Sequence, residues 1–219
     1  MENDEIQKLL IYRDALILVL NKPSGVPVHK GFGGGETVDD WLEDLRFGLP
    51  RKPALGHRLD KDTSGCLVLG RHTQALKRLG EMFADGRIKK IYWAIVKGKP
   101  PQDEGRIDLP LVKKEEGKHR WHMKVGAGGQ EAVTDYKLLK TFGEYSWLEL
   151  KPQTGRTHQL RVHCAEIGCP ILGDKFYGGG DEVPLHLHAR SIEIPLHEKK
   201  PAIYVEAEAP MYMNSFLAA

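Results

Sequence analysis

Hydrophobic and polar positions change their period several times along this chain, which predicts a succession of short strands and amphipathic helices. The first apolar run, ALILVL, predicts a buried strand over 15–20 that ends in the turn-forming sequence Lys-Pro-Ser-Gly. The segments EAVTDYKLLKTF (131–142) and YSWLELKP (145–152) predict a hairpin with Gly143 near its turn. Four other segments predict strands: GCLVLGR (65–71), KKIYWAIVKG (89–98), ARSIEIPL (189–196) and PAIYVEAEAP (201–210).

Three segments carry helical signals instead. Thr37 and Asp40 stand three residues apart in TVDDWLEDL, close to a capping box, and predict that a helix follows. In HTQALKRLGEMFADGRI (72–88) the apolar residues have helical spacing, and Gly86 is a stop signal. In HQLRVHCAEIG (158–168) the residues Leu160, Cys164 and Ile167 fall on one helical stripe, with Gly168 at its end.

The order of these elements is mixed, without a repeating strand–helix unit. This order predicts an α+β fold, in which helices and loops flank a mixed, largely antiparallel central sheet. The glycine clusters GFGGGE (31–36) and YGGGDE (177–182) are typical of surface loops, and no linker rich in Pro, Gly or Ser divides the chain. We therefore expect one domain over residues 1–219.

Composition limits the class of protein. The 219 residues are 41% hydrophobic and 28% charged, as in ordinary soluble globular proteins. No run approaches the roughly 20 apolar residues of a membrane span. The acidic start MENDE differs from a signal peptide, and three scattered cysteines are too few for a disulfide framework. We therefore expect a cytoplasmic protein, without membrane association, whose cysteines are buried.

The net charge is only +2, but the bases are clustered. Residues 70–99 contain eight Lys or Arg against two acids, and residues 113–124 contain five against two, with Trp121 among them. Basic patches with an interleaved aromatic suit a polyanion that also offers flat bases. A solvated charged face is the alternative for both segments. If they bind such a polyanion, we expect Lys89, Lys90, Lys118 and Arg120 to be among the contacts.

The stretch HRLDKDTSG (57–65) is too charged for a buried strand, yet it contains Leu59. Asp60 could be a cap, a salt-bridge partner or a catalytic group. The chain has no phosphate-binding glycine loop and no GxSxG elbow.

The histidines make a poor metal site. His158 and His163 would lie roughly 140° apart on a helix. His186 and His188 share a strand face but have no carboxylate nearby in the sequence. We therefore expect no metal, although a metal hydrolase that uses these histidines remains an alternative.

Five motifs occur together in one order: NKPSG (21–25), HRLDKDTSG, KKIYWAIVKG, TGRTHQLRVH (154–163) and GCPILGDKFYG (168–178). Together they resemble the RluA family of RNA pseudouridine synthases, from about residue 9 to about residue 210. The resemblance implies the pseudouridine synthase fold and the isomerisation of specific uridines in tRNA, in large-subunit ribosomal RNA, or in both. It also implies that the enzyme uses no metal and no cofactor.

The resemblance assigns roles residue by residue. Asp60 matches the catalytic aspartate, and Arg161 matches the arginine that pairs with it. Tyr92 matches the active-site tyrosine, which stacks on the uracil and is a candidate base at the ring carbon. Arg58 matches an arginine that contacts the RNA around the flipped nucleotide. No role follows for His57.

Many members of that family carry an extra N-terminal RNA-binding domain. Here 56 residues precede His57, and the strand over 15–20 belongs to the catalytic body, so we expect no such domain. We also expect a monomer. A non-catalytic RNA-binding protein of the same fold is a further alternative, but it would not need to keep Asp60, Tyr92 and Arg161 together. Their joint presence favours the enzyme.

Overall fold

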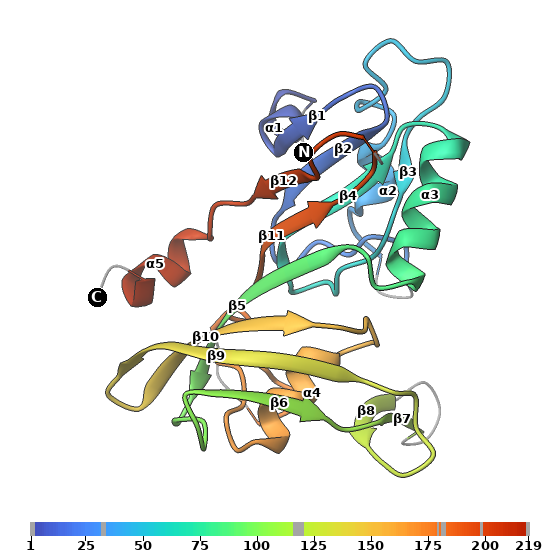
Figure 1. Cartoon of the computed structure of the whole chain (residues 1–219). Coiled ribbons are helices and arrows are strands. Elements are labelled where there is room, and N and C mark those ends of the chain that lie inside the picture. Colours follow the sequence, from blue (N-terminus) through green and yellow to red (C-terminus); the bar gives the residue numbers. More distant parts are fainter. Residues whose placement is uncertain are drawn as a thin grey trace. The chain divides into compact units, whose positions relative to one another are not determined.

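The chain divides into two compact units, which are described separately. The computed structural model describes residues 3–31, 34–115, 121–178, 180, 183–197 and 199–217. Unit 1 consists of Met1–Lys90 and Ala189–Ala209, and unit 2 consists of Ile91–His188 and Pro210–Ala219. Two of the three unit boundaries fall within strands, β5 (Lys89–Lys97) and β11 (Leu187–Ile194), and the third lies between Ala209 and Pro210 (Figure 1). The prediction of a single domain stays a prediction.

Unit 1 is built on an antiparallel sheet. Strand β2 pairs with β1 on one side and with β4 on the other, β3 pairs with the end of β4, and β12 pairs with β11. These four pairs are antiparallel. The helices and remaining strands of this unit are α1 (Asn3–Lys8), β1 (Leu10–Arg13), β2 (Ile17–Lys22), α2 (Val38–Trp41), β3 (Ala54–Leu55), β4 (Ser64–Gly70), α3 (Thr73–Ala84) and β12 (Ile203–Glu206).

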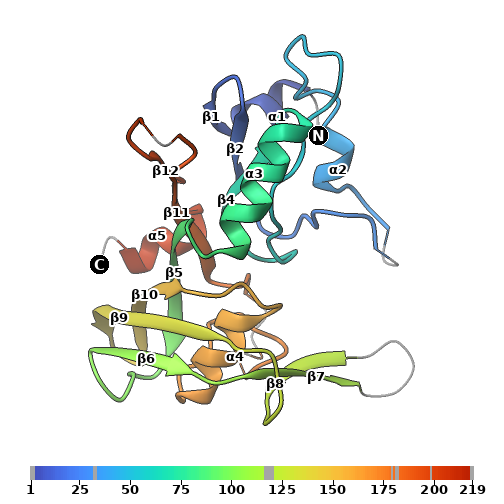
Figure 2. The same cartoon turned by 45° about the vertical axis from the view of Figure 1, so that its right-hand side comes forward.

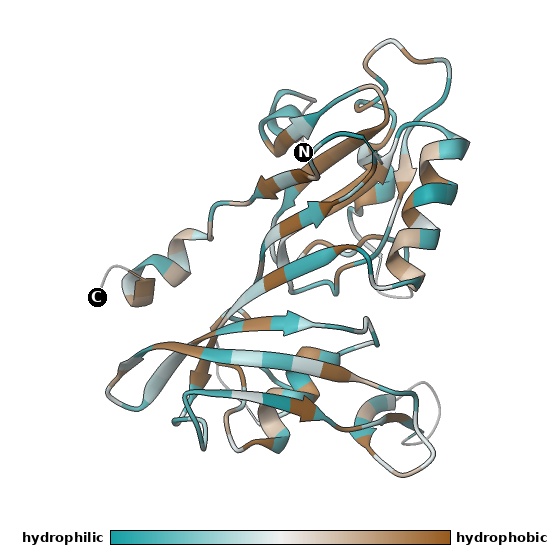
Figure 3. Ribbon diagram, in the orientation of Figure 1, coloured by the Kyte–Doolittle hydropathy of each residue, from teal (hydrophilic) through white to brown (hydrophobic). Residues whose placement is uncertain are grey.

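The core of unit 1 follows from its two most apolar segments. Every residue of β4 is buried, and all but one residue of β2, so both faces of these strands are covered. Figure 3 shows the hydrophobic colouring of this part of the sheet. Helix α3 buries Ala75, Leu79 and Met82 on one side. The strand predicted over 65–71 and the helix predicted over 72–88 are thereby confirmed, with the helix ending before Gly86.

The first predicted strand begins two residues later than expected. Asp14 Oδ1 accepts hydrogen bonds from the backbone N–H groups of Leu16 and Ile17, both at 2.7 Å. These bonds form a tight turn that keeps Ala15 and Leu16 out of the strand, so β2 begins at Ile17. The predicted capping box is present, because Asp40 Oδ2 accepts from the Thr37 N–H at 3.0 Å.

In unit 2 four strands pair antiparallel in the order β5, β10 (Tyr145–Pro152), β9 (Val133–Phe142) and β6 (Glu104–Asp108). The predicted hairpin is confirmed as β9 (Val133–Phe142) and β10 (Tyr145–Pro152), with Gly143 at φ +56° in its turn. Helix α4 (Gln159–Glu166) packs on one face of this sheet (Figure 2). Its Leu160 and Cys164 join a buried cluster with Leu148 and Leu150 of β10.

Four elements of unit 2 were not predicted: β6 (Glu104–Asp108), β7 (Leu111–Glu115), β8 (Trp121–Val125) and α5 (Met211–Leu217). Strands β7 and β8 pair with each other as a separate two-stranded sheet, and Leu111 of β7 also forms an isolated bridge with Gln130. Each of the three strands buries a single residue, respectively Ile107, Leu111 and Met123. Such polar segments carry almost no periodic signal.

The predicted α+β class and antiparallel pairing are confirmed. Cys66, Cys164 and Cys169 are buried and free, as predicted. Among the described helices, none has the length and apolar character needed to cross a membrane.

Candidate active site

Asp60 lies in the loop between β3 and β4 of unit 1. Leu59 is 4% exposed and anchors this loop in the core, which explains the single leucine among charged neighbours. Asp60 is partly exposed, and its backbone carbonyl accepts the Thr63 N–H at 3.2 Å. Thr63 and Ser64 are buried, so the loop is held at both ends while Asp60 remains accessible.

The NKPSG turn holds the Asp60 loop from a distant part of the chain. Gly25 N–H and the Lys22 ammonium both donate to the Lys61 carbonyl, each at 3.0 Å, and Ser24 Oγ donates to the Asp62 carbonyl at 2.7 Å. Both acceptors are backbone oxygens, and they belong to the two residues that directly follow Asp60. The turn therefore fixes the backbone next to the predicted catalytic carboxylate without using that carboxylate.

Lys22 is the buried charge of this arrangement. Its side chain is fully buried, and Nζ also donates to the carbonyls of Pro23 and Val26, both at 2.8 Å. Burial lowers the pKa of Lys22 to about 7, although the carboxylates of Asp62 and Asp60 oppose this shift.

His57 has a structural role that the sequence did not indicate. Its Nε2 accepts a hydrogen bond from the Val68 N–H at 3.0 Å, and its ring lies 4.7 Å from that of Phe83. Burial, together with the nearby Lys90 ammonium, lowers the pKa of His57 to about 4. His57 is therefore neutral near pH 7 and secures the start of the Asp60 loop to β4.

Tyr92 lies on β5 in unit 2, where it pairs with Leu150 of β10. It is partly buried and packs against the cluster that includes Leu160 of α4. One part of its ring is thus fixed by the core, and the rest is accessible.

Arg161, on α4, is only 5% exposed, so it is not an ordinary surface charge. Its Nε and Nη2 donate to the two carboxylate oxygens of Asp174, both at 2.7 Å, in a bidentate pair. Asp174 is fully buried, and its Oδ1 also accepts the N–H groups of Phe176 and Tyr177. No role for Asp174 was predicted, although it stands in the motif GCPILGDKFYG.

The predicted catalytic residues are thus distributed over both units. Asp60 belongs to unit 1, whereas Tyr92 and Arg161 belong to unit 2 and border its core. The pairing of Asp60 with Arg161 stays a prediction.

The predicted RNA contacts differ in their surroundings. Arg58 is exposed, and Lys89 is exposed but forms an ion pair with Glu193 at 2.9 Å. Burial lowers the pKa of Lys90. Lys118 and Arg120 lie outside the described residues.

Two histidines of the metal alternative are already engaged. His163 contacts Thr134 Oγ1 at 2.9 Å and the Leu109 carbonyl at 3.0 Å, one with each ring nitrogen, and His186 Nδ1 contacts the Pro184 carbonyl at 2.8 Å. In the described part of the chain, no group of three or more His, Cys, Asp or Glu side chains could hold a metal ion.

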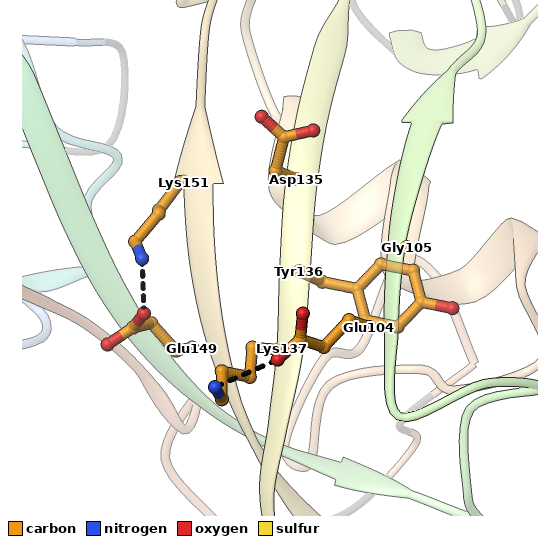
Figure 4. A pocket seen from close by; sticks show the side chains of 7 residues that line it. All are labelled: Glu104, Gly105, Asp135, Tyr136, Lys137, Glu149 and Lys151. Atoms are coloured by element: carbon orange, nitrogen blue, oxygen red, sulfur yellow. Dashed lines mark ion pairs between the residues drawn. The ribbon is translucent and has the colours of Figure 1, made fainter.

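A pocket on the β6–β9–β10 surface contains none of the predicted site residues (Figure 4). Its charges pair with one another, Lys137 with Glu104 at 2.8 Å and Lys151 with Glu149 at 2.7 Å. These pairs leave little charge for a ligand, so we assign no function to this pocket.

Comparison with known proteins adds an independent line of evidence. The family model described as RNA pseudouridylate synthase matches residues 16–166. An uncharacterized RNA pseudouridine synthase of Zymomonas mobilis is 43% identical over 210 residues, or 94% of both chains. Ribosomal large subunit pseudouridine synthase D of Borreliella burgdorferi is 40% identical over 197 residues, which cover 84% of this chain and 60% of that protein.

A solved structure shows the same likeness in three dimensions. Human RNA Pseudouridylate Synthase Domain Containing 4 matches with a TM-score of 0.83 and 28% identity, and covers 99% of this chain and 94% of that one. This likeness confirms the fold that the motifs predicted.

Proposed function

This chain belongs to the RNA pseudouridylate synthase family, and we propose that it isomerises specific uridines of tRNA or large-subunit ribosomal RNA, with Asp60 as the catalytic carboxylate. The observation that carries this proposal is the family match over residues 16–166, which contains Asp60, Tyr92 and Arg161 in order. The name of the similar Borreliella burgdorferi protein supports the ribosomal substrate. The enzyme is an isomerase.

The chemistry defines what the site must supply. The bond from the sugar to ring nitrogen N1 breaks, the uracil rotates, and a bond to ring carbon C5 forms. C5 then loses its proton and N1 gains one, so no atoms or electrons are exchanged overall. A carboxylate, a base and a surface that retains the free uracil are sufficient. We therefore propose that neither metal nor cofactor takes part.

In this proposal Asp60 attacks the anomeric carbon or removes a sugar proton, and both routes need it ionised. The hydrogen bond from the buried Lys22 ammonium to the Lys61 carbonyl holds the backbone next to Asp60. Tyr92 stacks on the uracil and is the candidate base at C5, and Arg161 pairs with Asp60 in the assembled site.

RNA recognition in this proposal combines charge with base flipping. The target leaves its stack at a cost of about a few kcal/mol, so an unpaired or weakly paired uridine is favoured. Arg58 contacts the RNA around the flipped nucleotide, and the basic segments that contain Lys89, Lys90, Lys118 and Arg120 position the phosphates.

We further propose that residues 1–219 form one catalytic domain that acts as a monomer in the cytoplasm. The three free, buried cysteines are consistent with a reducing compartment.

The test compares Asp60→Asn with Asp62→Asn on ribosomal RNA and tRNA that lack modifications. Asparagine neither attacks nor accepts a proton at neutral pH, so Asp60→Asn should bind RNA and form no detectable pseudouridine. Asp62 contacts Ser24 through its backbone carbonyl, which Asn keeps, so Asp62→Asn should retain substantial activity. The measurement is chemical mapping of pseudouridine at each uridine. Substantial turnover by Asp60→Asn would contradict its assignment, and an inactive wild-type protein would contradict the substrate proposal.

A further inference from the structure

Part of the surface of unit 2 carries large aromatic side chains to which the proposed reaction gives no role. Trp121, at the start of β8, is 42% exposed, and Phe176, in the turn after Asp174, is 66% exposed. Large apolar side chains at such exposure leave ring surface in water, so their positions require an explanation.

These rings are arranged in a row around His158. The Trp121 and His158 rings stack, with centroids 5.7 Å apart and planes at 23°. The Phe176 ring also contacts the His158 ring, with centroids 6.3 Å apart and planes at 38°. We refer to Trp121, His158 and Phe176 as the aromatic row. It joins the β7–β8 hairpin, the start of α4 and the turn after Asp174.

Hydrogen bonds of the Tyr177 hydroxyl connect the aromatic row to strand β8. The Tyr177 hydroxyl accepts the Met123 N–H of β8 at 3.0 Å and lies 2.8 Å from His158 Nδ1. The backbone of His158 is in the left-handed region, at φ +55°, which is uncommon for a residue other than glycine. This conformation places the ring between the hairpin and the turn.

The buried ion pair fixes the other end of the row. Asp174 Oδ1 accepts the Phe176 N–H at 3.0 Å, and the Arg161 guanidinium carbon lies 5.4 Å from the centre of the Phe176 ring. The rings are therefore preorganised, and binding to them costs little side-chain entropy.

Charge around the row favours a polyanion. Lys113 Nζ lies 5.4 Å from the centre of the Trp121 ring and also forms an ion pair with Glu115 at 3.0 Å. The described segments that carry the row, 113–115, 121–125, 156–161 and 174–178, contain six Lys or Arg against two acids, which leaves a formal charge of +4. The six are Lys113, Lys114, Lys124, Arg156, Arg161 and Lys175, and the acids are Glu115 and Asp174.

We propose that the aromatic row is a stacking site for an unpaired base of the RNA, other than the uridine that is isomerised. Only an unpaired nucleobase presents its full face to an aromatic ring. The surrounding Lys and Arg side chains attract the phosphates on either side of that nucleobase. The proposal rests on the proposed function for its RNA substrate. In this proposal Trp121 helps to determine which segment of the RNA is bound, and it has no role in the chemistry.

The test measures binding of a short single-stranded RNA that contains a uridine the wild-type enzyme modifies. Trp121→Ala should weaken binding by about 5- to 100-fold, the range expected for loss of one base–aromatic stack. Trp121→Phe keeps an aromatic face and should recover most of the affinity. Phe176→Leu keeps apolar bulk over Arg161 but removes the ring, so it should also weaken binding.

A second set of RNAs identifies the stacked base, with an abasic ribose placed at each position in turn. At one position, the abasic RNA should bind the wild-type protein more weakly than the intact RNA does. Trp121→Ala should bind the same abasic RNA and the intact RNA with equal affinity, because the stack is already lost. Tyr204→Ala, which removes an exposed aromatic of unit 1, is the matched control and should bind as wild type. Equal affinity of Trp121→Ala and wild type, or equal loss with every abasic RNA, would overturn the stacking site. Wild-type pseudouridine formation in the same samples shows separately whether the proposed function holds.

Discussion

Lys22 shows how a single buried residue can set the geometry of a site without touching the substrate. Three carbonyl oxygens surround its ammonium group, so all three N–H bonds are used only when the amine is protonated. One of these carbonyls belongs to Lys61, the residue after Asp60. Loss of the ammonium would leave this carbonyl with the hydrogen bond from the Gly25 N–H but without the one from Lys22, which would loosen the backbone next to the Asp60 carboxylate.

Lys22→Met should therefore lower kcat more than it changes KM, by about 10- to 100-fold for a displacement on the order of 1 Å. Lys61→Ala is the matched control, because Lys61 contributes its backbone carbonyl and Ala keeps it. Steady-state kinetics on one RNA substrate measure both parameters. Equal kcat values for Lys22→Met and wild type would show that the NKPSG turn holds the loop without this charge.

The pKa of Lys22 also predicts a pH dependence of stability. The folded value is about 7, whereas the unfolded chain has about 10.4, so the unfolded state binds more protons between these pH values. Lys22 therefore makes the free energy of unfolding rise with pH across this window, by at most about 1.4 kcal/mol per pH unit. In urea denaturation, the free energy of unfolding of wild type minus that of Lys22→Met should therefore become more positive as pH increases. A constant difference would contradict the shifted pKa.

At the scale of elements, α4 is tied to the following turn by the buried pair of Arg161 and Asp174. Breaking such a pair leaves an uncompensated charge, so Asp174→Ala should destabilise the fold by about 3–5 kcal/mol. Asp135→Ala breaks the exposed pair with Arg106, also bidentate, and should cost at most about 1 kcal/mol. Chemical denaturation of both variants tests this contrast, and similar losses would argue against it.

Strand β4 begins where two backbones approach closely. Gly65 has φ +106°, and a Cβ added there would lie 2.3 Å from the Ala189 carbonyl oxygen of β11. This close approach explains the glycine at the end of HRLDKDTSG, directly after the loop that carries Asp60.

Gly65→Ala should therefore destabilise the protein by more than about 1 kcal/mol, because it strains the backbone and forces the strands apart. Gly80→Ala is the control, since Gly80 lies within α3 and has no atom within 4 Å of an added Cβ. That substitution should stabilise the protein by about 0.5–1 kcal/mol. Thermal unfolding of the two variants should shift the midpoint in opposite directions.

For the whole molecule, the proposal of one catalytic domain predicts how the chain unfolds. Trp41 lies in unit 1, whereas Trp93 and Trp147 lie in unit 2 with ring centroids 4.8 Å apart. If the units fold as one domain, tryptophan fluorescence and far-UV circular dichroism should report a single coincident transition in urea. Separate transitions would show two independently folding units instead.

The sequence by itself determined the most regular elements and the family. Strand β4, helix α3 and the β9–β10 hairpin follow from apolar runs, helical spacing and a turn glycine, which are local signals. The motifs around Asp60, Tyr92 and Arg161 identified the enzyme because their order is specific. The polar strands β6, β7 and β8 were missed, since each buries one residue and forms only by pairing with other segments.

Only the tertiary structure decided what surrounds the site residues. Lys22 reads in the sequence as part of a turn, but its burial and its bond to Lys61, 39 residues away, depend on how distant segments meet. The same holds for His57, which accepts from Val68, and for Asp174, which neutralises Arg161. A side chain's burial, pKa and partner are set by contacts between segments far apart in the chain. The periodicity of a sequence, in contrast, depends only on residues that are close together in the chain.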